Sequence, residues 1–123
     1  MNRAIKAALA NERVIDITTT GRKSGESRRI EIWFHRVDDR YYITGSPGPR
    51  GWYANLLANP RFTFHLKGNT AADLVATAHP VTDPVQKQAI FDGIPWIADR
   101  VEAEKIPEWI GGSPLVEVRF EGA

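Results

Sequence analysis

The chain has 123 residues, of which 42% are hydrophobic and 25% are charged, and its formal net charge is +1. This length suits one domain with its own core, so we expect a single domain over residues 1–123. The hydrophobic share excludes a disordered chain. The sequence has no cysteine, which excludes disulfides, thiolate metal sites and a cysteine nucleophile and fits a cytoplasmic protein.

The N-terminal residues do not read as a secretory signal, because their short apolar stretch is interrupted by Lys6. No stretch approaches the roughly 20 apolar residues needed to cross a bilayer. We therefore expect a cytoplasmic protein with no integral membrane segment, attached at most to a membrane surface.

The first third of the chain predicts a helix followed by two strands. Residues 2–11 carry apolar side chains at helical spacing and predict a short amphipathic helix. Residues 13–20 are mostly β-branched and predict a strand. Two glycines and two serines make residues 21–27 a loop, and from Arg28 apolar and polar residues alternate as in a second strand.

The middle of the chain predicts three more strands and one helix. Asp38-Asp39 indicates a turn into a strand at residues 41–44, and the proline and glycine of residues 46–51 predict irregular structure. Residues 52–59 predict a helix that ends before Pro60. Strands are expected at residues 61–67 and 74–78, joined by a turn at Gly68-Asn69.

The last third predicts helices and a closing strand. Asp83 and Pro84 are typical of a helix start, and helical structure is expected with breaks to about Trp109. Residues 114–120 predict a strand. The fold class is therefore mainly β (α+β): six antiparallel strands, which favour a barrel because closure removes exposed edges, with a few short helices.

The loop at residues 21–29 carries four cations against one acid. Its glycines let backbone N–H groups turn toward an anion, and its hydroxyls and cationic side chains add donors and charge. It lacks the phosphate-loop pattern, because no nucleotide-binding helix follows Lys23. A focused positive loop on a nearly neutral protein suits a small anionic ligand, although a solvated basic hairpin fits the same residues.

The segment from Ser46 to Tyr53 is a second candidate site. It brings Ser46 and Arg50 next to a helix start, where negative groups are favoured, and Trp52 and Tyr53 could stack on a planar ring. The alternative is that the two aromatic residues only fasten this helix to the sheet.

Other polar residues give weaker signals. The three histidines have no metal-ligand spacing, so we expect no metal, and Ser24 has no identifiable base, so we expect no protein nucleophile or other catalytic residue. The apolar region from Ile94 to Trp109 predicts core, a dimer contact or the wall of a substrate pocket. Aromatic residues do not interleave with the basic loop, which argues against nucleic-acid binding.

Two motifs in this order resemble the deazaflavin-dependent nitroreductase and quinone reductase family, a branch of the split-β-barrel flavoproteins related to pyridoxamine phosphate oxidase. They are Thr18-Thr-Thr-Gly-Arg-Lys-Ser-Gly with Arg28, and Trp52-Tyr-Ala-Asn-Leu-Leu-Ala-Asn-Pro-Arg-Phe. The resemblance is strongest over residues 14–68. It implies a split barrel that binds coenzyme F420, a deazaflavin hydride carrier with a phosphodiester-linked oligoglutamate tail, and it implies a homodimer.

Carried over by position, the resemblance implies cofactor-binding roles for residues of both motifs and the segment between them. These are Thr20, Arg22, Lys23, Ser24, Gly25, Arg28, Ser46, Arg50, Trp52, Tyr53 and Asn55. Trp33, Trp96 and Trp109 are the candidates for the substrate pocket. The expected reaction is hydride transfer from the reduced deazaflavin to an apolar small-molecule acceptor such as a quinone, an enone or a nitro compound. An FMN-dependent oxidoreductase and a non-catalytic protein that binds a cofactor, haem or lipid remain the alternatives.

Overall fold

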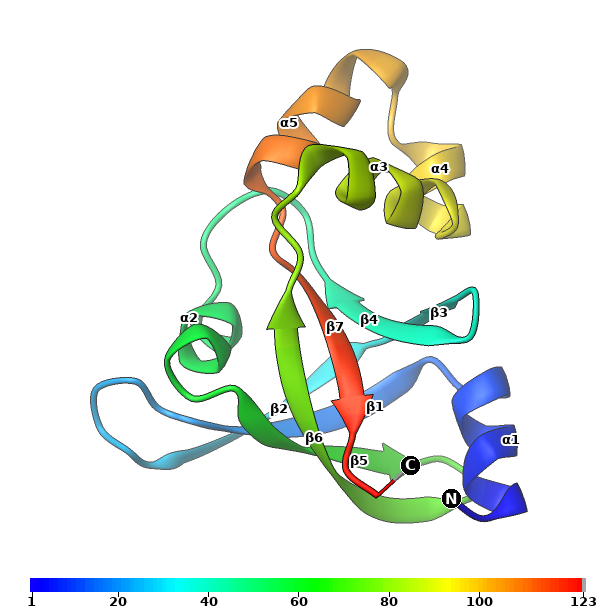
Figure 1. The fold of residues 1–123 in the computed structure, drawn as a ribbon, viewed down its shortest axis with the longest axis vertical. Helices are drawn as coiled ribbons and strands as arrows, with labels where there is room; N and C mark the ends of the chain where they lie inside the picture. Colours follow the sequence, from blue (N-terminus) through cyan, green and yellow to red (C-terminus); the bar gives the residue numbers. More distant parts are fainter. Residues whose placement is uncertain (123) are drawn as a thin grey trace.

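A computed structural model describes residues 1–122 of the chain. It contains one sheet in the order β2-β1-β5-β6-β7-β4-β3, in which all neighbours are antiparallel (Figure 1). The strands are β1 (Val14–Thr20), β2 (Ser27–Trp33), β3 (His35–Val37), β4 (Arg40–Thr44), β5 (Arg61–Lys67), β6 (Ala71–Pro80) and β7 (Leu115–Phe120). The antiparallel split barrel expected from the sequence is confirmed, with seven strands in place of six.

The seventh strand arises because the expected second strand is divided at Phe34. Strands β2 and β3 are consecutive in the chain but lie at opposite edges of the sheet. A direct step from one edge to the other requires the sheet to curl on itself. The Phe34 N–H donates to the Arg13 carbonyl at 2.9 Å, and its ring packs edge-on against Phe64, with ring centroids 5.1 Å apart. This phenylalanine therefore fastens the closure of the half-barrel.

Five helices and a 3₁₀ turn complete the fold. They are α1 (Arg3–Asn11), α2 (Gly51–Ala58), α3 (Pro84–Asp92), α4 (Pro95–Arg100), η1 (Ala103–Lys105) and α5 (Ile106–Gly112). Proline occupies the first turn of α3, α4 and α5, which explains the breaks expected in this region. The Asp83 carboxylate caps α3 by accepting from the Gln86 N–H at 2.9 Å.

The apolar side chains form two buried clusters. The larger lies between the inner face of the sheet and helices α1 and α2, and it includes Phe34, Leu56 and Phe64. The smaller joins Tyr42 and Leu115 of the sheet to α3, α4 and α5, which gather at one end of the molecule (Figure 1, top). Helix α2 contributes Leu56 to the larger cluster, and other residues of this helix line two different pockets.

No helix in residues 1–122 is long and apolar enough to cross a membrane. The same residues contain no group of three or more histidine, aspartate and glutamate side chains arranged to hold a metal ion.

Candidate functional site

A pocket of 390 Å³ lies between the basic loop and α2. One wall comes from β1, the loop and the start of β2, and the other from the first two turns of α2. Its lining residues are Thr19, Gly21, Arg22, Lys23, Ser24, Arg28, Ile30, Gly51, Trp52 and Asn55. We call it the loop pocket. It unites both sequence motifs, which are separated by more than twenty residues along the chain.

The backbone of the loop is held by short internal hydrogen bonds. The Gly21 N–H donates to the Glu26 carbonyl at 2.8 Å, and the Gly25 N–H donates to the Gly21 carbonyl at 2.9 Å. Gly25 has a φ of 71°, in the left-handed region that favours glycine. A Cβ atom on Gly21 would lie 2.5 Å from the Ser24 Oγ. A larger residue at Gly21 would therefore displace the Ser24 hydroxyl, and one at Gly25 would be strained by the positive φ.

Asn55 connects the loop to α2. Its Oδ1 accepts from the Arg22 backbone N–H at 3.1 Å, and its Nδ2 donates to the Thr19 Oγ1 at 3.2 Å. Both partners line the loop pocket, so this amide sets the distance between the pocket's two walls.

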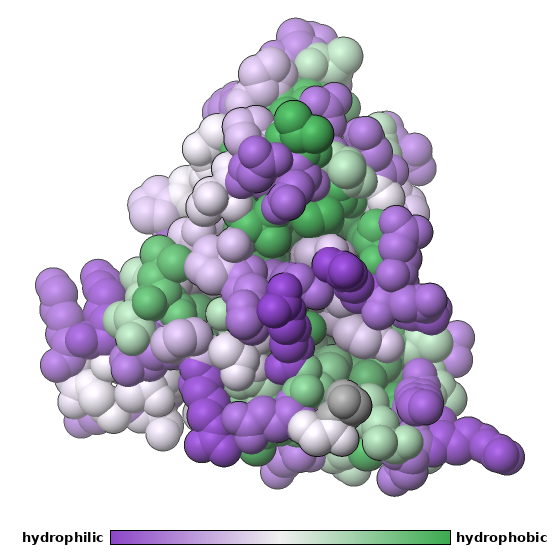
Figure 2. Space-filling view, viewed as in Figure 1, coloured by the Kyte–Doolittle hydropathy of each residue, from purple (hydrophilic) through white to green (hydrophobic). Residues whose placement is uncertain are grey.

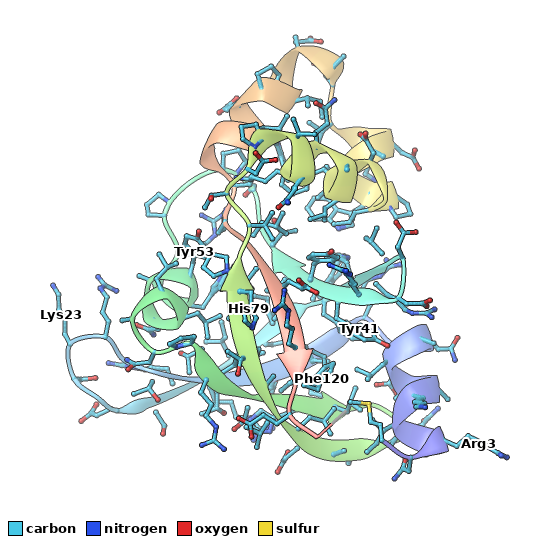
Figure 3. All side chains as sticks on the ribbon, viewed as in Figure 1. Arg3, Lys23, Tyr41, Tyr53, His79 and Phe120 are labelled. Atoms are coloured by element: carbon cyan, nitrogen blue, oxygen red, sulfur yellow. The ribbon has the colours of Figure 1, made fainter. Side chains whose placement is uncertain are left out.

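The loop pocket has a strongly positive rim. Arg22, Lys23 and Arg28 are exposed and form no salt bridge within residues 1–122. Lys23 extends from the tip of the projecting loop, and hydrophilic side chains cover this part of the surface (Figures 2 and 3). Arg29 follows Arg28 but points to the other face of the sheet, where it pairs with Asp16 at 3.0 Å. Three cations thus remain available to an anionic ligand.

The start of α2 adds backbone donors to the same pocket. Arg50 is the N-cap residue, and its side chain makes no capping hydrogen bond. The first N–H groups of a helix lack intrahelical acceptors, and the helix dipole favours a negative group there. Gly51 and Trp52 line the pocket at this point. Cations, backbone donors and an indole ring therefore meet in one place, which is the donor set that a phosphate joined to a planar ring requires.

Several of the residues predicted to bind cofactor lie outside the lining. Thr20 borders a different pocket of 500 Å³ on the outer face of the sheet, and Tyr53 borders a pocket of 540 Å³ on the other side of α2. Ser46 and Arg50 come together, because the guanidinium donates to the Ser46 carbonyl and Oγ, both at 2.9 Å. Arg50 thereby supports its own loop.

The three tryptophans predicted to line the substrate pocket do not form one group. Trp96 and Trp109 contact each other edge-on, with ring centroids 5.6 Å apart, in the smaller apolar cluster. Trp33 lies at the end of edge strand β2, where it is 48% exposed and the Arg13 guanidinium lies 5.7 Å from its ring. The region from Ile94 to Trp109 contributes core, one of the alternatives that the sequence left open.

Four lining residues were missed in the sequence: Thr19, Gly21, Ile30 and Gly51. The alternation of inward and outward residues along a strand could have identified two of them, Thr19 and Ile30. Ile15 and Ile17 are buried on the inner face of β1, so the next inward residue is Thr19, and Thr20 must face outward. In β2 the same alternation puts Arg28 and Ile30 on one face.

The outer face of the sheet holds a chain of three polar side chains from neighbouring strands. Thr18 Oγ1 lies 2.7 Å from His65 Nε2, and His65 Nδ1 lies 2.7 Å from Asp73 Oδ1. The imidazole lowers the pKa of the Asp73 carboxyl by hydrogen bonding to it. Asp73 is exposed, and neither it nor His65 lines a described pocket, so we interpret the chain as a cross-strand contact.

A model of the F420H(2)-dependent quinone reductase family matches residues 2–95. The chain belongs to this family. The match spans the whole loop pocket, and membership makes the protein an F420-dependent reductase with coenzyme F420 as its cofactor. Helix α5 and strand β7 follow the matched segment.

Solved structures of low sequence identity share the fold. A putative pyridoxamine 5'-phosphate oxidase from Listeria innocua has a TM-score of 0.72 and 16% identity, over 96% of this chain and 91% of that one. An F420-H2 dependent reductase (FDR-A) has a TM-score of 0.61 and 22% identity, over 88% of this chain and 95% of that one. A chain described as a domain-swapped dimer has a TM-score of 0.57 and 21% identity, over 88% of this chain and 81% of that one. These likenesses support the split barrel that the resemblance implied.

Proposed function

We propose that the loop pocket holds the phosphate and the start of the acidic tail of coenzyme F420, and that the reductase acts on an apolar quinone, enone or nitro acceptor. When bound, the reduced deazaflavin supplies a hydride to such an acceptor. The observation that carries this proposal is that three cations, which form no salt bridge within residues 1–122, meet the start of α2, where no side chain caps the helix.

Each wall of the pocket has a separate task in this proposal. Arg22, Lys23 and Arg28 neutralise the phosphate and the first carboxylates, and the Ser24 hydroxyl adds a donor. Trp52 and Ile30 provide apolar surface beside the ring and keep water away from it. Asn55 holds the two walls together through its contacts with Arg22 and Thr19.

A fluorescence titration with F420 tests the site. Replacing Arg22 and Lys23 together by alanine should weaken F420 binding by at least about 100-fold, because each charge-assisted contact contributes about 1.5–3 kcal/mol. The matched control removes one arginine and one lysine from α1, Arg3→Ala with Lys6→Ala, and should leave the affinity within about twofold. Equal losses in both double variants would contradict the assignment.

A parallel titration with FMN separates the cofactor alternatives. FMN carries one phosphate and no oligoglutamate tail, so it should bind more weakly than F420 and respond less to loss of the loop cations. Tight FMN binding with no F420 binding would favour the flavin alternative. F420 binding without reduction of any quinone would favour the non-catalytic alternative.

We also propose a homodimer in which the exposed edge strand β2 pairs with its copy. All residues of β2 are exposed except the half-buried Ile32, and Ile30 and Trp33 leave apolar surface at this edge. If the two strands pair antiparallel with Ile30 opposite Ile30 of the second copy, Arg29 of each copy lies opposite Glu31 of the other. The pairing therefore forms two contacts between opposite charges. Sedimentation should report a dimer that Arg29→Glu weakens, whereas a monomer at tens of micromolar would overturn this proposal.

A further inference from the structure

The pocket on the other side of α2 contains a buried cation. Lys87 on α3 is 5% exposed and forms no salt bridge within residues 1–122. Its ammonium carries three N–H donors, and one of them donates to the Ser113 carbonyl at 2.8 Å. The structure shows no acceptor for the other two. A buried charge with incomplete partners is costly unless a ligand completes its hydrogen bonds.

Ser113 supplies a second unsatisfied group. Its side-chain Oγ is buried and has no hydrogen-bond partner among the described residues, and the residue is only 4% exposed. It borders the same 540 Å³ pocket as Lys87, together with Tyr53 from α2 and Ile110 from α5. Among the lining residues Lys87 is the charged one and Tyr53 is the other titratable one. The site therefore offers donors to a ligand oxygen and apolar surface to the rest of the ligand.

This pocket is a neighbour of the loop pocket. The two pockets lie on either side of the first turn of α2. Trp52 lines one and Tyr53 the other, and their rings meet edge-on with centroids 5.9 Å apart. Figure 3 shows Tyr53 between α2 and the helices at the top of the view. Ile110 and Ser113 lie beyond the segment that the family model matches.

We propose that Lys87 and Ser113 bind a carbonyl oxygen of the acceptor and that Lys87 donates the proton that accompanies its reduction. This inference rests on the reductase function proposed above. Reduction of a quinone to a quinol adds one hydride, which brings two electrons, and one proton. The hydride would come from a C–H bond of the reduced deazaflavin and form a bond to one quinone oxygen, which leaves negative charge on the other oxygen. A Lys87 N–H bond then breaks, an O–H bond forms on that oxygen, and the neutral amine regains a proton from solvent.

The electrostatics of the site suit this role. Burial lowers the pKa of the Lys87 ammonium. An ammonium with a lowered pKa is a better proton donor near neutral pH than an exposed lysine. The charge also stabilises the anionic oxygen that forms as the acceptor is reduced.

A purely structural role for Lys87 is the competing explanation, because its bond to the Ser113 carbonyl caps the end of α5. Two variants separate the explanations. Lys87→Met removes the donor and the charge and can also weaken the cap. Ser113→Ala removes only a hydroxyl that has no internal partner, so it should leave the fold stable and impair the site alone.

The first experiment measures ligand binding without any cofactor. Equilibrium dialysis with 2-hydroxy-1,4-naphthoquinone, an acidic quinone that carries an anionic oxygen, should show binding that Lys87→Met weakens at least about tenfold, as expected for a charge-assisted hydrogen bond. Ser113→Ala should weaken it by about two- to tenfold. Absence of binding to the wild type, or equal binding to all three proteins, would overturn the proposal.

The second experiment measures menadione reduction with reduced F420. Lys87→Met should lower kcat by about 100-fold or more, the usual loss on removing a general acid, and leave the F420 affinity unchanged. The wild-type rate should fall at alkaline pH as Lys87 loses its proton, and the variant should lack that fall. Unchanged kcat and pH profile would overturn the proton-donor role. Failure of F420 to bind, with probe binding still dependent on Lys87, would instead overturn the cofactor assignment of the loop pocket.

Discussion

At the scale of single residues, His35 and Trp96 form a contact that gives the fold a pH dependence. The Trp96 Nε1–H donates to the His35 Nε2 at 3.3 Å, which places the ring proton of the neutral histidine on Nδ1. Burial, and to a lesser degree the charge of Arg13, lowers the pKa of His35 to about 4. The unfolded chain binds this proton near the ordinary pKa of about 6.5.

We therefore expect stability to decrease as pH falls from 6.5 to 4, because the unfolded state takes up a proton there that the folded state does not. Above pH 6.5 both states are neutral at this residue. The loss should reach about 3 kcal/mol near pH 4. Urea unfolding at several pH values would measure it, and His35→Gln should flatten this part of the dependence. Parallel curves for the two proteins would contradict the assignment.

The second prediction at this scale concerns the chain Thr18–His65–Asp73. Thr18→Val should destabilise the protein by about 1 kcal/mol, because the His65 Nε2 loses its partner. F420 binding should not change, because Thr18 faces the outer side of the sheet. Denaturant unfolding together with the fluorescence titration would check both expectations. A loss of cofactor affinity without a loss of stability would assign this chain to the functional site.

At the scale of elements, the shape of the loop between β1 and β2 is set by its backbone conformation. Its sequence predicted a loop, and the structure adds the hydrogen bonds that shape it, from Gly21 to Glu26 and from Gly25 to Gly21. A ligand-binding loop that is shaped before the ligand arrives loses less entropy on binding.

Gly25→Ala tests this conformation. A Cβ atom would meet nothing within 4 Å, so the cost comes from the positive φ alone and should be about 1–2 kcal/mol. Gly111→Ala is the matched control, because it also meets nothing within 4 Å but lies within α5, where alanine should stabilise by about 0.5–1 kcal/mol. Chemical denaturation would measure both, and equal effects of the same sign would contradict the strain argument.

At the scale of the whole molecule, the closure of the half-barrel depends on packing between residues distant in sequence. Phe34 is 2% exposed and contacts Phe64, thirty residues along the chain. Phe34→Ala should cost about 3–5 kcal/mol, since it leaves a cavity where the sheet turns from one edge to the other. Leu57→Ala, at a residue that is 52% exposed, should cost less than about 1 kcal/mol. Urea midpoints would compare the two variants.

Most elements could be predicted from the sequence because their signals are local. The β-branched run of β1, the Asp83 cap and the prolines at helix starts act over a few residues. The family resemblance that implied the cofactor rests on the basic loop and on the motif around Trp52, and it could be recognised because both motifs are continuous in sequence. Six of the residues that line the loop pocket were predicted to bind the cofactor, namely Arg22, Lys23, Ser24, Arg28, Trp52 and Asn55.

The sequence by itself determined most of the strands and helices, the antiparallel class and the chemistry of the basic loop, because periodicity, capping and charge are properties of short segments. Only the tertiary structure decided that Thr19 rather than Thr20 faces α2, that the chain changes edges at Phe34, and that Lys87 meets Ser113. These outcomes depend on which surfaces become buried together, and burial is settled by long-range packing that no short segment encodes.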